Sequence, residues 1–382
     1  MPNNLGRQIN KVRELVAENI CTDVIRVLHV AETCRGGVGS AIRDIANGGD
    51  DTVLFHSVLH PEEHPISGLN QRVTSVAYRR SGRNFQSLVR LAIALHAQIK
   101  IYRPHVVHAH STFAGMVVRL VLARKWLKRE VSVAYTAHGW SFDRSGHGLA
   151  NALYRGVEFI LSKLCDRVVC LSKHELALAK GARISERKIR LIYNAHPRLD
   201  DADHRLSVRP GEYRVLFVGR FDHQKGFDIL VESIDLLKNE AIHFTLIGEA
   251  VRKRRGDAPI PAGVDALGWQ PPEVVYEHMR SATVLVVPSR WEGFALAPLE
   301  AMCLGTPVLS SGASSLPEAV IEGVSGKRFD SGTAYELASI LKATTVEEWQ
   351  AIGKRAKEFC REVFSPDAML SATYKLYKEI SP

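Results

Sequence analysis

Apolar, β-branched runs alternate with helical runs along this chain, and the alternation occurs twice. The first series begins with VIRVLHVA at 24–31, and the second restarts with YRVLFVGR at 213–220. Strands that alternate with helices predict parallel sheets. Between the two series, residues 197–212 are polar and contain two prolines, which is typical of a linker. The pattern therefore predicts two doubly wound α/β domains, at 1–196 and 213–364, with the interdomain cleft as the expected site.

The length and composition agree with two globular domains. The chain has 382 residues, which is too many for one ordinary core, and no run approaches the roughly 20 apolar residues of a membrane span. The first 20 residues lack the apolar core of an export signal, and we expect a polar loop and a short amphipathic helix there. The six cysteines form no C-x-x-C pair, so we expect reduced, buried thiols in a cytoplasmic protein.

Positive charge is concentrated in the first half of the chain. Residues 1–200 carry 29 Lys and Arg against 16 Asp and Glu, whereas residues 201–382 carry 21 against 25. This asymmetry indicates an anionic partner, such as a phospholipid surface, a diphosphate-linked lipid or nucleic acid. Because the chain has no nucleic-acid-binding motif and few aromatic residues, we do not expect nucleic acid.

The most specific motif lies in the second half. TVLVVPSRW at 283–291 is apolar enough for a buried strand, and LAPLEAMCLG at 296–305 is typical of a short helix. Glu292 is expected where the strand ends, and Glu300 two turns into the helix. The N–H groups of 293–296 would point from the helix N-terminus towards ligand oxygens. Two glutamates alone are commonly just exposed side chains, but this context favours a ligand site.

A second motif, VGRFDHQKG at 218–226, follows the first strand of the second domain. Arg220 and Lys225 lie there beside the N-terminus of the next predicted helix. Such a loop alone is often only a solvated basic turn. Two cations near free N–H groups nevertheless suit a diphosphate, and they would stabilise negative charge that grows on a leaving group.

Three features of the first half are candidates for binding. The run RGGVGS at 35–40 follows the first strand without the spacing of a dinucleotide fingerprint, so it is a tight turn or a phosphate-approaching loop. His138 ends the predicted strand 131–139, where the alternative to a ligand contact is a histidine satisfied by local hydrogen bonds. His108 and His110 share another strand end. With no third ligand evident, we expect them to line the acceptor cleft or to pack, and not to bind a metal.

The strand, EGF, P-L-E-A-M and G-T-P-V-L together resemble the donor-binding signature of family 4 glycosyltransferases, the retaining GT-B enzymes that use nucleotide-sugars. The resemblance extends from about residue 24 to the C-terminus and is of the bacterial polysaccharide-biosynthesis type. It implies a GT-B fold in which the C-terminal helix, here 365–382, crosses back to the N-terminal domain. It also implies a UDP- or GDP-sugar donor, a glycan or lipid-linked acceptor, no cofactor and no catalytic metal.

The resemblance also implies residue roles. The catalytic set would be His138, which contacts the transferring sugar, Glu292, which orients donor hydroxyls and stabilises oxocarbenium character, and the diphosphate-binding pair Arg220 and Lys225. Glu300 would hold the ribose. The donor-binding residues would be Gly36, Gly37, Gly219, Arg220, Lys225, Glu292, Gly293, Phe294, Ala295, Leu296 and Glu300.

The sequence departs from the family pattern at a few positions. Asn194-Ala195 stands where the family usually has Asn-Gly, and only Pro317-Glu318 remains of a usual G-G-x-P-E. Ala295 replaces a frequent glycine, which leaves the backbone donors intact. The D-x-D of Asp201 and Asp203 falls in the predicted linker, where a solvated acidic turn is the simplest interpretation.

The basic runs RRSGR at 79–83 and RKWLKR at 124–129 resemble the membrane-docking surface of monotopic GT-B enzymes. We therefore expect a cytoplasmic protein, peripheral on the inner face of the membrane. Two alternatives stay open, namely another GT-B enzyme such as a sugar-nucleotide epimerase, and a non-catalytic nucleotide-sugar-binding protein. The epimerases lack the EGF…PLE signature, and loss of Arg220, Lys225 or Glu292 would have indicated a binding protein.

Overall fold

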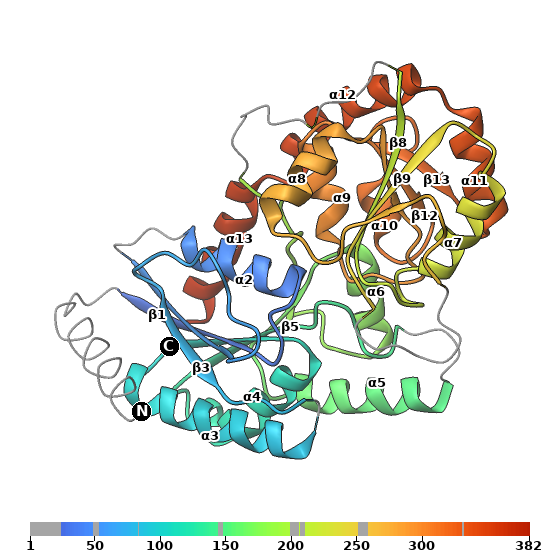
Figure 1. The fold of residues 1–382 in the computed structure, drawn as a ribbon. Helices are drawn as coiled ribbons and strands as arrows, with labels where there is room; N and C mark the ends of the chain where they lie inside the picture. Colours follow the sequence, from blue (N-terminus) through green and yellow to red (C-terminus); the bar gives the residue numbers. More distant parts are fainter. Residues whose placement is uncertain are drawn as a thin grey trace. The chain divides into compact units, whose positions relative to one another are not determined.

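The structure of the protein is a computed structural model that divides into two compact units (Figure 1). Unit 1 comprises Met1–Tyr193 with Asp367–Pro382, and unit 2 comprises Asn194–Pro366. The expectations for residues 1–20 and for the acidic turn in the linker lie outside the described residues. The structure describes residues 24–48, 53–82, 84–143, 148–198, 206, 211–250, 259–330 and 332–382.

Unit 1 is built on a parallel sheet of seven strands in the order β3-β2-β1-β4-β5-β6-β7. The chain moves outward from β1 in one direction and from β4 in the other, so the topological switch point lies between these two strands. The strands are β1 (Ile25–Ala31), β2 (Leu54–Pro61), β3 (Thr74–Tyr78), β4 (Val106–His110), β5 (Ser132–Thr136), β6 (Arg167–Cys170) and β7 (Ile189–Leu191).

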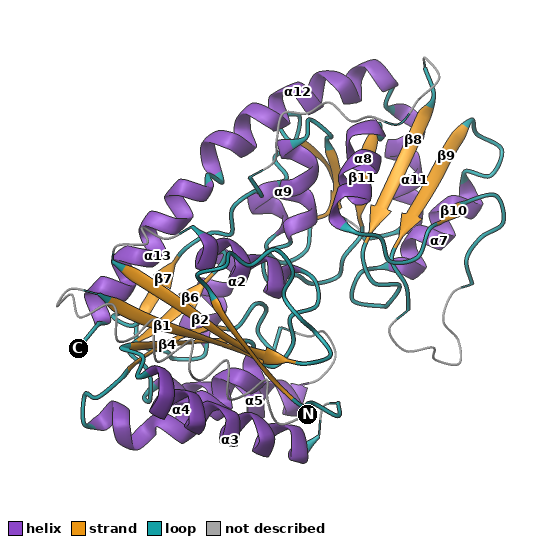
Figure 2. Ribbon diagram, turned by 60° about the vertical axis from the view of Figure 1, so that its left-hand side comes forward, coloured by secondary structure: helices purple, strands orange, loops and turns teal. Residues whose placement is uncertain are grey.

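Helices cover both faces of the unit 1 sheet, as two-sided burial of a parallel sheet requires. Helices α3, α4 and α5 form one layer, and α2 and α13 lie on the opposite face (Figure 2). The hydroxyl of Tyr377 on α13 lies 2.7 Å from Nδ1 of His108 on β4, so the C-terminal helix packs on this sheet, as predicted. The helices are α2 (Gly37–Asn47), α3 (Phe85–Tyr102), α4 (Thr112–Leu127), α5 (Gly148–Ser162), α6 (Lys173–Gly181) and α13 (Pro366–Ile380).

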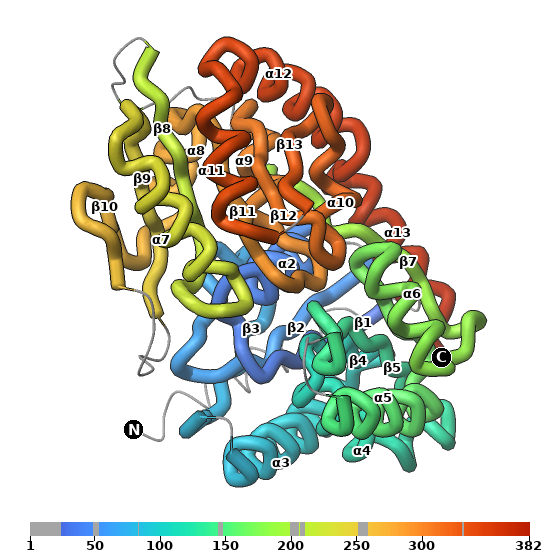
Figure 3. The backbone as a smooth tube through the Cα atoms, turned by 90° about the vertical axis from the view of Figure 1, so that its right-hand side faces the viewer, coloured from blue at the N-terminus to red at the C-terminus, as the bar shows by residue number. Residues whose placement is uncertain are grey.

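Unit 2 repeats the plan with six parallel strands in the order β10-β9-β8-β11-β12-β13 (Figure 3). Its switch point lies between β8 and β11. The strands are β8 (Tyr213–Val218), β9 (Ile242–Ile247), β10 (Asp265–Ala266), β11 (Val284–Val287), β12 (Val308–Ser311) and β13 (Gly326–Phe329). The helices are α7 (Phe227–Leu236), α8 (Pro272–Ser281), α9 (Leu296–Cys303), α10 (Leu316–Ala319), α11 (Ala334–Ala343) and α12 (Val346–Val363).

The prediction of two doubly wound domains is confirmed, but some details differ. Strand β3, which the sequence analysis did not predict, lies at an edge of the unit 1 sheet. The last part of unit 2 breaks between α11 and α12, because the backbone of Thr344 and Thr345 is extended and Thr345 caps α12 by accepting from the Glu348 N–H. Glu300 is the fifth residue of α9, so it lies about one turn into that helix, and not two.

Candidate active site

The loops that follow β8 and β11 carry the two motifs of the second domain. These strands are hydrogen-bonded neighbours on either side of the unit 2 switch point, where ligands of open α/β sheets bind. The loop after β8 spans 219–226, and the loop after β11 spans 288–295. The fold therefore brings together residues that are far apart in the sequence.

Lys225 and Glu292 form the direct link between these loops. Nζ of Lys225 lies 2.6 Å from Oε1 of Glu292, and the same oxygen accepts a hydrogen bond of 2.7 Å from the Ser289 hydroxyl. The Glu292 side chain is only 8% exposed, whereas that of Lys225 is 23% exposed. The buried Glu292 carboxylate needs such partners, and a ligand can still reach the more exposed Lys225 ammonium.

Arg220 belongs to the same cluster through Gln224, a residue that the sequence interpretation missed. A guanidinium N–H of Arg220 donates to Oε1 of Gln224 at 2.7 Å, and Arg220 also pairs with Asp222 at 3.2 Å. The Gln224 amide in turn donates to the Trp291 carbonyl at 3.3 Å. Because the Arg220 side chain is 39% exposed and offers five N–H donors, it retains donors for an anion.

Gly226 allows the two loops to approach each other. Its φ of 65° lies in the left-handed region, and a Cβ atom there would come within 1.9 Å of the Pro288 carbonyl oxygen. A side chain at this position would therefore force the loops apart. The glycine of the Lys225-Gly226 pair is thus required by the close packing of the two motif loops.

The N-terminus of α9 lies at the end of the second loop. Its N-cap is Ala295, and no side chain caps the helix. Asn194, to which sequence reasoning gave no role, donates from Nδ2 to the Phe294 carbonyl at 3.2 Å and so holds this turn. The Phe294 ring is buried and packs on Phe364, with ring centroids 5.4 Å apart. Phe294 therefore offers a ligand its backbone and not its ring.

In unit 1 the glycine loop follows β1 and opens α2 at the switch point. Gly36 is the N-cap with a φ of 68°, and its carbonyl accepts from the Gly39 N–H at 3.1 Å. Gly36 and Gly37 are exposed, whereas a Cβ atom on Gly39 would lie 2.2 Å from the Cys34 carbonyl oxygen. The loop is a tight turn whose first two glycines leave the backbone open to approach.

His138 lies just after β5 in a strained conformation, with a φ of 53°. The next residue is held by Glu175, because the Gly139 N–H donates to Oε1 of Glu175 at 2.6 Å. The other carboxylate oxygen accepts from the Leu171 N–H at 2.7 Å. Burial raises the pKa of Glu175 to about 7, against the opposing effect of these backbone donors. Sequence reasoning missed Glu175, which lies in the first turn of α6, where its N–H donates to the hydroxyl of the N-cap Ser172 at 3.0 Å.

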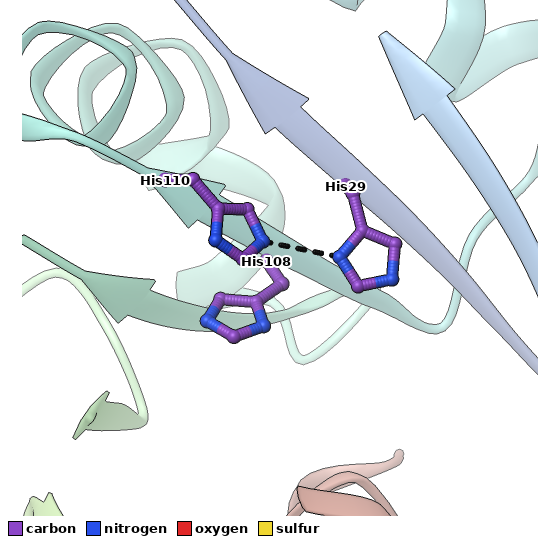
Figure 4. A group of neighbouring side chains, drawn as sticks. All are labelled: His29, His108 and His110. Carbon is purple, nitrogen blue, oxygen red and sulfur yellow. Dashed lines mark hydrogen bonds between the residues drawn. The ribbon is translucent and has the colours of Figure 1, made fainter. Parts of the chain in front are cut away.

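His108 and His110 do not line a cleft, because both are buried in the sheet at 2% and 1% exposure. They pack instead, which is the other alternative expected for them, and His29 on β1, a third histidine that was not evident in the sequence, lies beside them (Figure 4). One ring nitrogen of each lies within 4.8 Å of the others. Both nitrogens of His108 are already bonded, to the hydroxyls of Tyr377 at 2.7 Å and Thr136 at 2.8 Å, so a metal ion would have to displace these bonds.

The two halves of the chain match two protein families. Residues 35–196 match the family described as Glycosyltransferase Family 4, and residues 200–358 match the family described as Glycosyl transferases group 1. The chain is 30% identical over 363 residues to an uncharacterized 41.2 kDa protein in the cps region of Klebsiella pneumoniae, which covers 93% of this chain and 99% of that protein. These matches span most of the described fold.

A further relative and two solved structures extend the comparison. UDP-Gal:alpha-D-GlcNAc-diphosphoundecaprenol alpha-1,3-galactosyltransferase of Escherichia coli is 25% identical over 239 residues, which are 57% of this chain and 60% of that protein. Anabaena Alr3699/HepE, solved with UDP and glucose, gives a TM-score of 0.76 at 16% identity and covers 93% of this chain and 99% of that one. Sucrose-phosphate synthase from Thermosynechococcus elongatus gives 0.74 at 21% identity with the same coverage. The GT-B fold predicted from the sequence is confirmed.

Proposed function

The chain belongs to the glycosyltransferases, with a family 4 half and a group 1 half, and from that premise we propose a retaining enzyme that uses a nucleoside-diphosphate sugar. The acceptor in this proposal is a hydroxyl of a glycan. The observation that carries it is the cluster at the unit 2 switch point, where Arg220, Lys225 and Glu292 converge from two loops.

Each member of the cluster has a chemical role in this proposal. Arg220 and Lys225 bind the diphosphate together with N–H groups at the α9 N-terminus, and they stabilise its charge as it departs. A diphosphate competes with Glu292 for the Lys225 ammonium, which leaves the carboxylate to accept sugar hydroxyls. Glu300 on α9 is assigned to the ribose, and His138 of unit 1 to the transferred sugar.

The reaction step proposed is departure and attack on one face of the sugar. The bond from C1 to the diphosphate oxygen breaks, and its electron pair goes to the leaving phosphate. The acceptor oxygen forms a new bond to C1 from the same side, and its hydroxyl proton passes to a phosphate oxygen. The cations that hold the diphosphate supply the charge stabilisation that a divalent metal gives elsewhere, so the step is proposed to be metal-independent.

A lipid-linked or cell-surface polysaccharide intermediate is the proposed acceptor class. The relative in the Klebsiella cps region and the Escherichia coli enzyme named for a diphosphoundecaprenol acceptor support this class. The charge balance of residues 1–200, 29 Lys and Arg against 16 Asp and Glu, suits an anionic substrate surface.

The α3–α4–α5 layer of unit 1 is the proposed contact with an anionic membrane. Its outer side chains include apolar groups that are largely exposed, with Leu149 at 92%, Leu153 at 69% and Phe85 at 79%. Exposed basic residues, among them Arg124 and Lys128 at the end of α4, lie in the same layer. Apolar groups beside cations suit a bilayer interface. Within the described part of the chain, the helices are too short or too polar to span a membrane.

Thermal unfolding with a panel of nucleotide-sugars tests the proposed donor class. A ligand at 100 times its Kd adds about 2.7 kcal/mol to the free energy of unfolding. The cognate donor should therefore raise Tm clearly more than the free sugar does. Lys225→Ala should abolish this rise. A nuclear magnetic resonance spectrum of the product then gives the anomeric configuration. An inverted product would contradict the retaining mechanism, and no rise with any UDP- or GDP-sugar would contradict the donor class.

A further inference from the structure

Four histidines of unit 1 form one continuous hydrogen-bonded row from β2 across β1 and β4 to the residues after β5. Nε2 of His138 lies 3.0 Å from Nδ1 of His110, and Nε2 of His110 lies 3.1 Å from Nδ1 of His29. Nε2 of His29 lies 2.9 Å from Nδ1 of His56. Nε2 of His56 is buried and has no hydrogen-bond partner among the described residues. One end of the row is therefore His56, whose outer nitrogen is unpartnered among the described residues, and the other end is His138, the candidate sugar-contacting residue.

The sheet itself places these rings together. His29 on β1 is in register with His108 on β4, and His110 lies two residues further along β4, so their side chains share one face. His56 comes from β2 on the other side of β1. Helix α13 covers this face, and its Tyr377 ring lies 6.3 Å from the ring of His29 and 6.4 Å from that of His56.

Burial disfavours the charged form of all four imidazoles. Burial lowers the pKa of His56 and of His138 to about 4. Burial first, and then the charges of neighbouring histidines, holds the pKa of His29 and of His110 well below the usual value. A neutral imidazole carries one N–H donor and one acceptor nitrogen, so a ring that is bonded at both nitrogens, as His110 and His29 are, donates at one and accepts at the other.

Neutral rings leave only two self-consistent arrangements, because each bond joins Nε2 of one ring to Nδ1 of the next. In the first, every proton is on Nε2, and the buried Nε2–H of His56 has no acceptor. In the second, every proton is on Nδ1, and the unpartnered atom of His56 is a lone pair. An unpaired buried donor or acceptor costs about 1–3 kcal/mol. Among backbone groups, orphaned buried N–H donors are rarer than under-satisfied acceptors, and the same ordering favours the second arrangement here.

We infer that this row fixes His138 as a neutral ring with its proton on Nδ1, so that His138 is a hydrogen-bond donor and not a base. Nε2 of His138 accepts from His110, and Nδ1–H remains to donate to an oxygen of the bound sugar. His110, His29 and His56 act as positioning residues. The assignment of the sugar as the acceptor of this bond rests on the proposed function.

A neutral donor suits the proposed step. The sugar ring gains positive character as the diphosphate leaves, and an imidazolium beside it would oppose that charge. A neutral Nδ1–H holds a sugar oxygen without this penalty. The row also orients the ring, since rotation of His138 about χ2 would break its bond to His110.

Labelling the full-length protein with ¹⁵N-histidine and recording long-range ¹H–¹⁵N correlations tests the tautomer directly. The expected spectrum shows protonated Nδ1 and bare Nε2 for His138, His110, His29 and His56, which is opposite to the tautomer that isolated histidine favours. Assignment uses single-site variants. In His110→Leu the His138 signals should move towards the ordinary tautomer, whereas in the matched control His108→Leu they should not. His108 shares the face but lies outside the row.

Wild-type His138 protonated on Nε2, or charged near pH 7, would overturn the inference without any variant having to fold. That result would leave the proposed transferase reaction standing, because the spectrum is recorded without substrate. Activity provides a second readout. His138→Gln keeps a neutral donor and should retain kcat within about tenfold of wild type, while His138→Phe should lose on the order of 10²-fold, as loss of an aimed donor does. Equal losses in both variants would contradict the donor role.

Discussion

Nζ of Lys225 lies 2.6 Å from Oε1 of Glu292, although 67 residues separate them in the chain. The contact exists because β8 and β11 are neighbours at the switch point and each contributes the loop at its carboxyl end. Ser289 holds the same carboxylate oxygen at 2.7 Å. The cation assigned to the diphosphate and the carboxylate assigned to the sugar are thus one coupled unit, and perturbing either changes the partner of the other.

The first prediction concerns the two cations of this site. Arg220→Ala and Lys225→Ala should each lower kcat on the order of 10²-fold or more, because each removes a donor aimed at the charge that develops on the leaving diphosphate. Steady-state turnover with the cognate donor is the measurement. Lys238→Ala is the control, since Lys238 is an exposed cation of unit 2 outside both motif loops. Turnover within threefold of wild type for both test variants would contradict the assignment.

Metal independence is the second prediction. Arg220 and Lys225 supply positive charge at the diphosphate, so EDTA should leave the transfer rate nearly unchanged. The measurement compares initial rates with excess EDTA, and with EDTA followed by Mg²⁺ or Mn²⁺. Loss of activity in EDTA with recovery on adding either ion would mean that a metal carries the leaving-group charge.

The fold and the unit 2 site were largely predictable, and the histidine row was not. The motifs around Arg220 and Glu292 follow the apolar strands β8 and β11, and the carboxyl ends of parallel strands meet at one sheet edge whatever the detailed packing. Gln224 and Glu175 were missed because their roles depend on loop geometry that no local pattern encodes. His29 and His56 lie within the strands β1 and β2, where no local pattern marks either residue. Only the register of β1 against β2 and β4 shows that they meet His110.

The third prediction is a loss of stability in mild acid. Burial lowers the pKa of His108 to about 3, and it also lowers the pKa of each of the four histidines of the row. Between about pH 6.5 and pH 4 the unfolded chain binds protons that the folded chain does not, so the free energy of unfolding falls as pH falls. Each such group contributes about 1.4 kcal/mol per pH unit. Glu175, with its pKa raised to about 7, acts in the opposite direction over part of this range.

Urea denaturation at several pH values between 7.5 and 5 measures this slope. His56→Gln removes one titrating ring, so its slope should be shallower by up to about 1.4 kcal/mol per pH unit, a limit approached only below pH 6, where the unfolded histidine is mostly protonated. Glu175→Gln should make the slope steeper, since it removes the opposing group. A free energy of unfolding that stays constant or rises towards pH 5 would contradict the neutral, buried state of these histidines.

The surface of the α3–α4–α5 layer sharpens the expectation of membrane binding. On α5, the exposed Leu149, Leu153 and Ile160 follow helical spacing, with Ile160 at 60% exposure. Of the basic run at the end of α4, Lys125 pairs with Glu130 at 2.7 Å, whereas Arg124 and Lys128 are exposed. Arg124 and Lys128 are therefore the better positions for charge reversal.

The fourth prediction is reversible, salt-dependent binding of unit 1 to anionic membranes. Each Lys or Arg near such a surface contributes about 1 kcal/mol within a Debye length, so a few cations with the apolar groups of α5 suffice without a span. Vesicle flotation with and without anionic lipid, at low and moderate salt, is the measurement. Arg124→Glu with Lys128→Glu should weaken binding, whereas Lys238→Glu with Lys354→Glu, an equal change in net charge on exposed residues of unit 2, should not. Wild-type protein that stays unbound in all four conditions would contradict membrane docking, and the basic surface would then serve an anionic soluble acceptor.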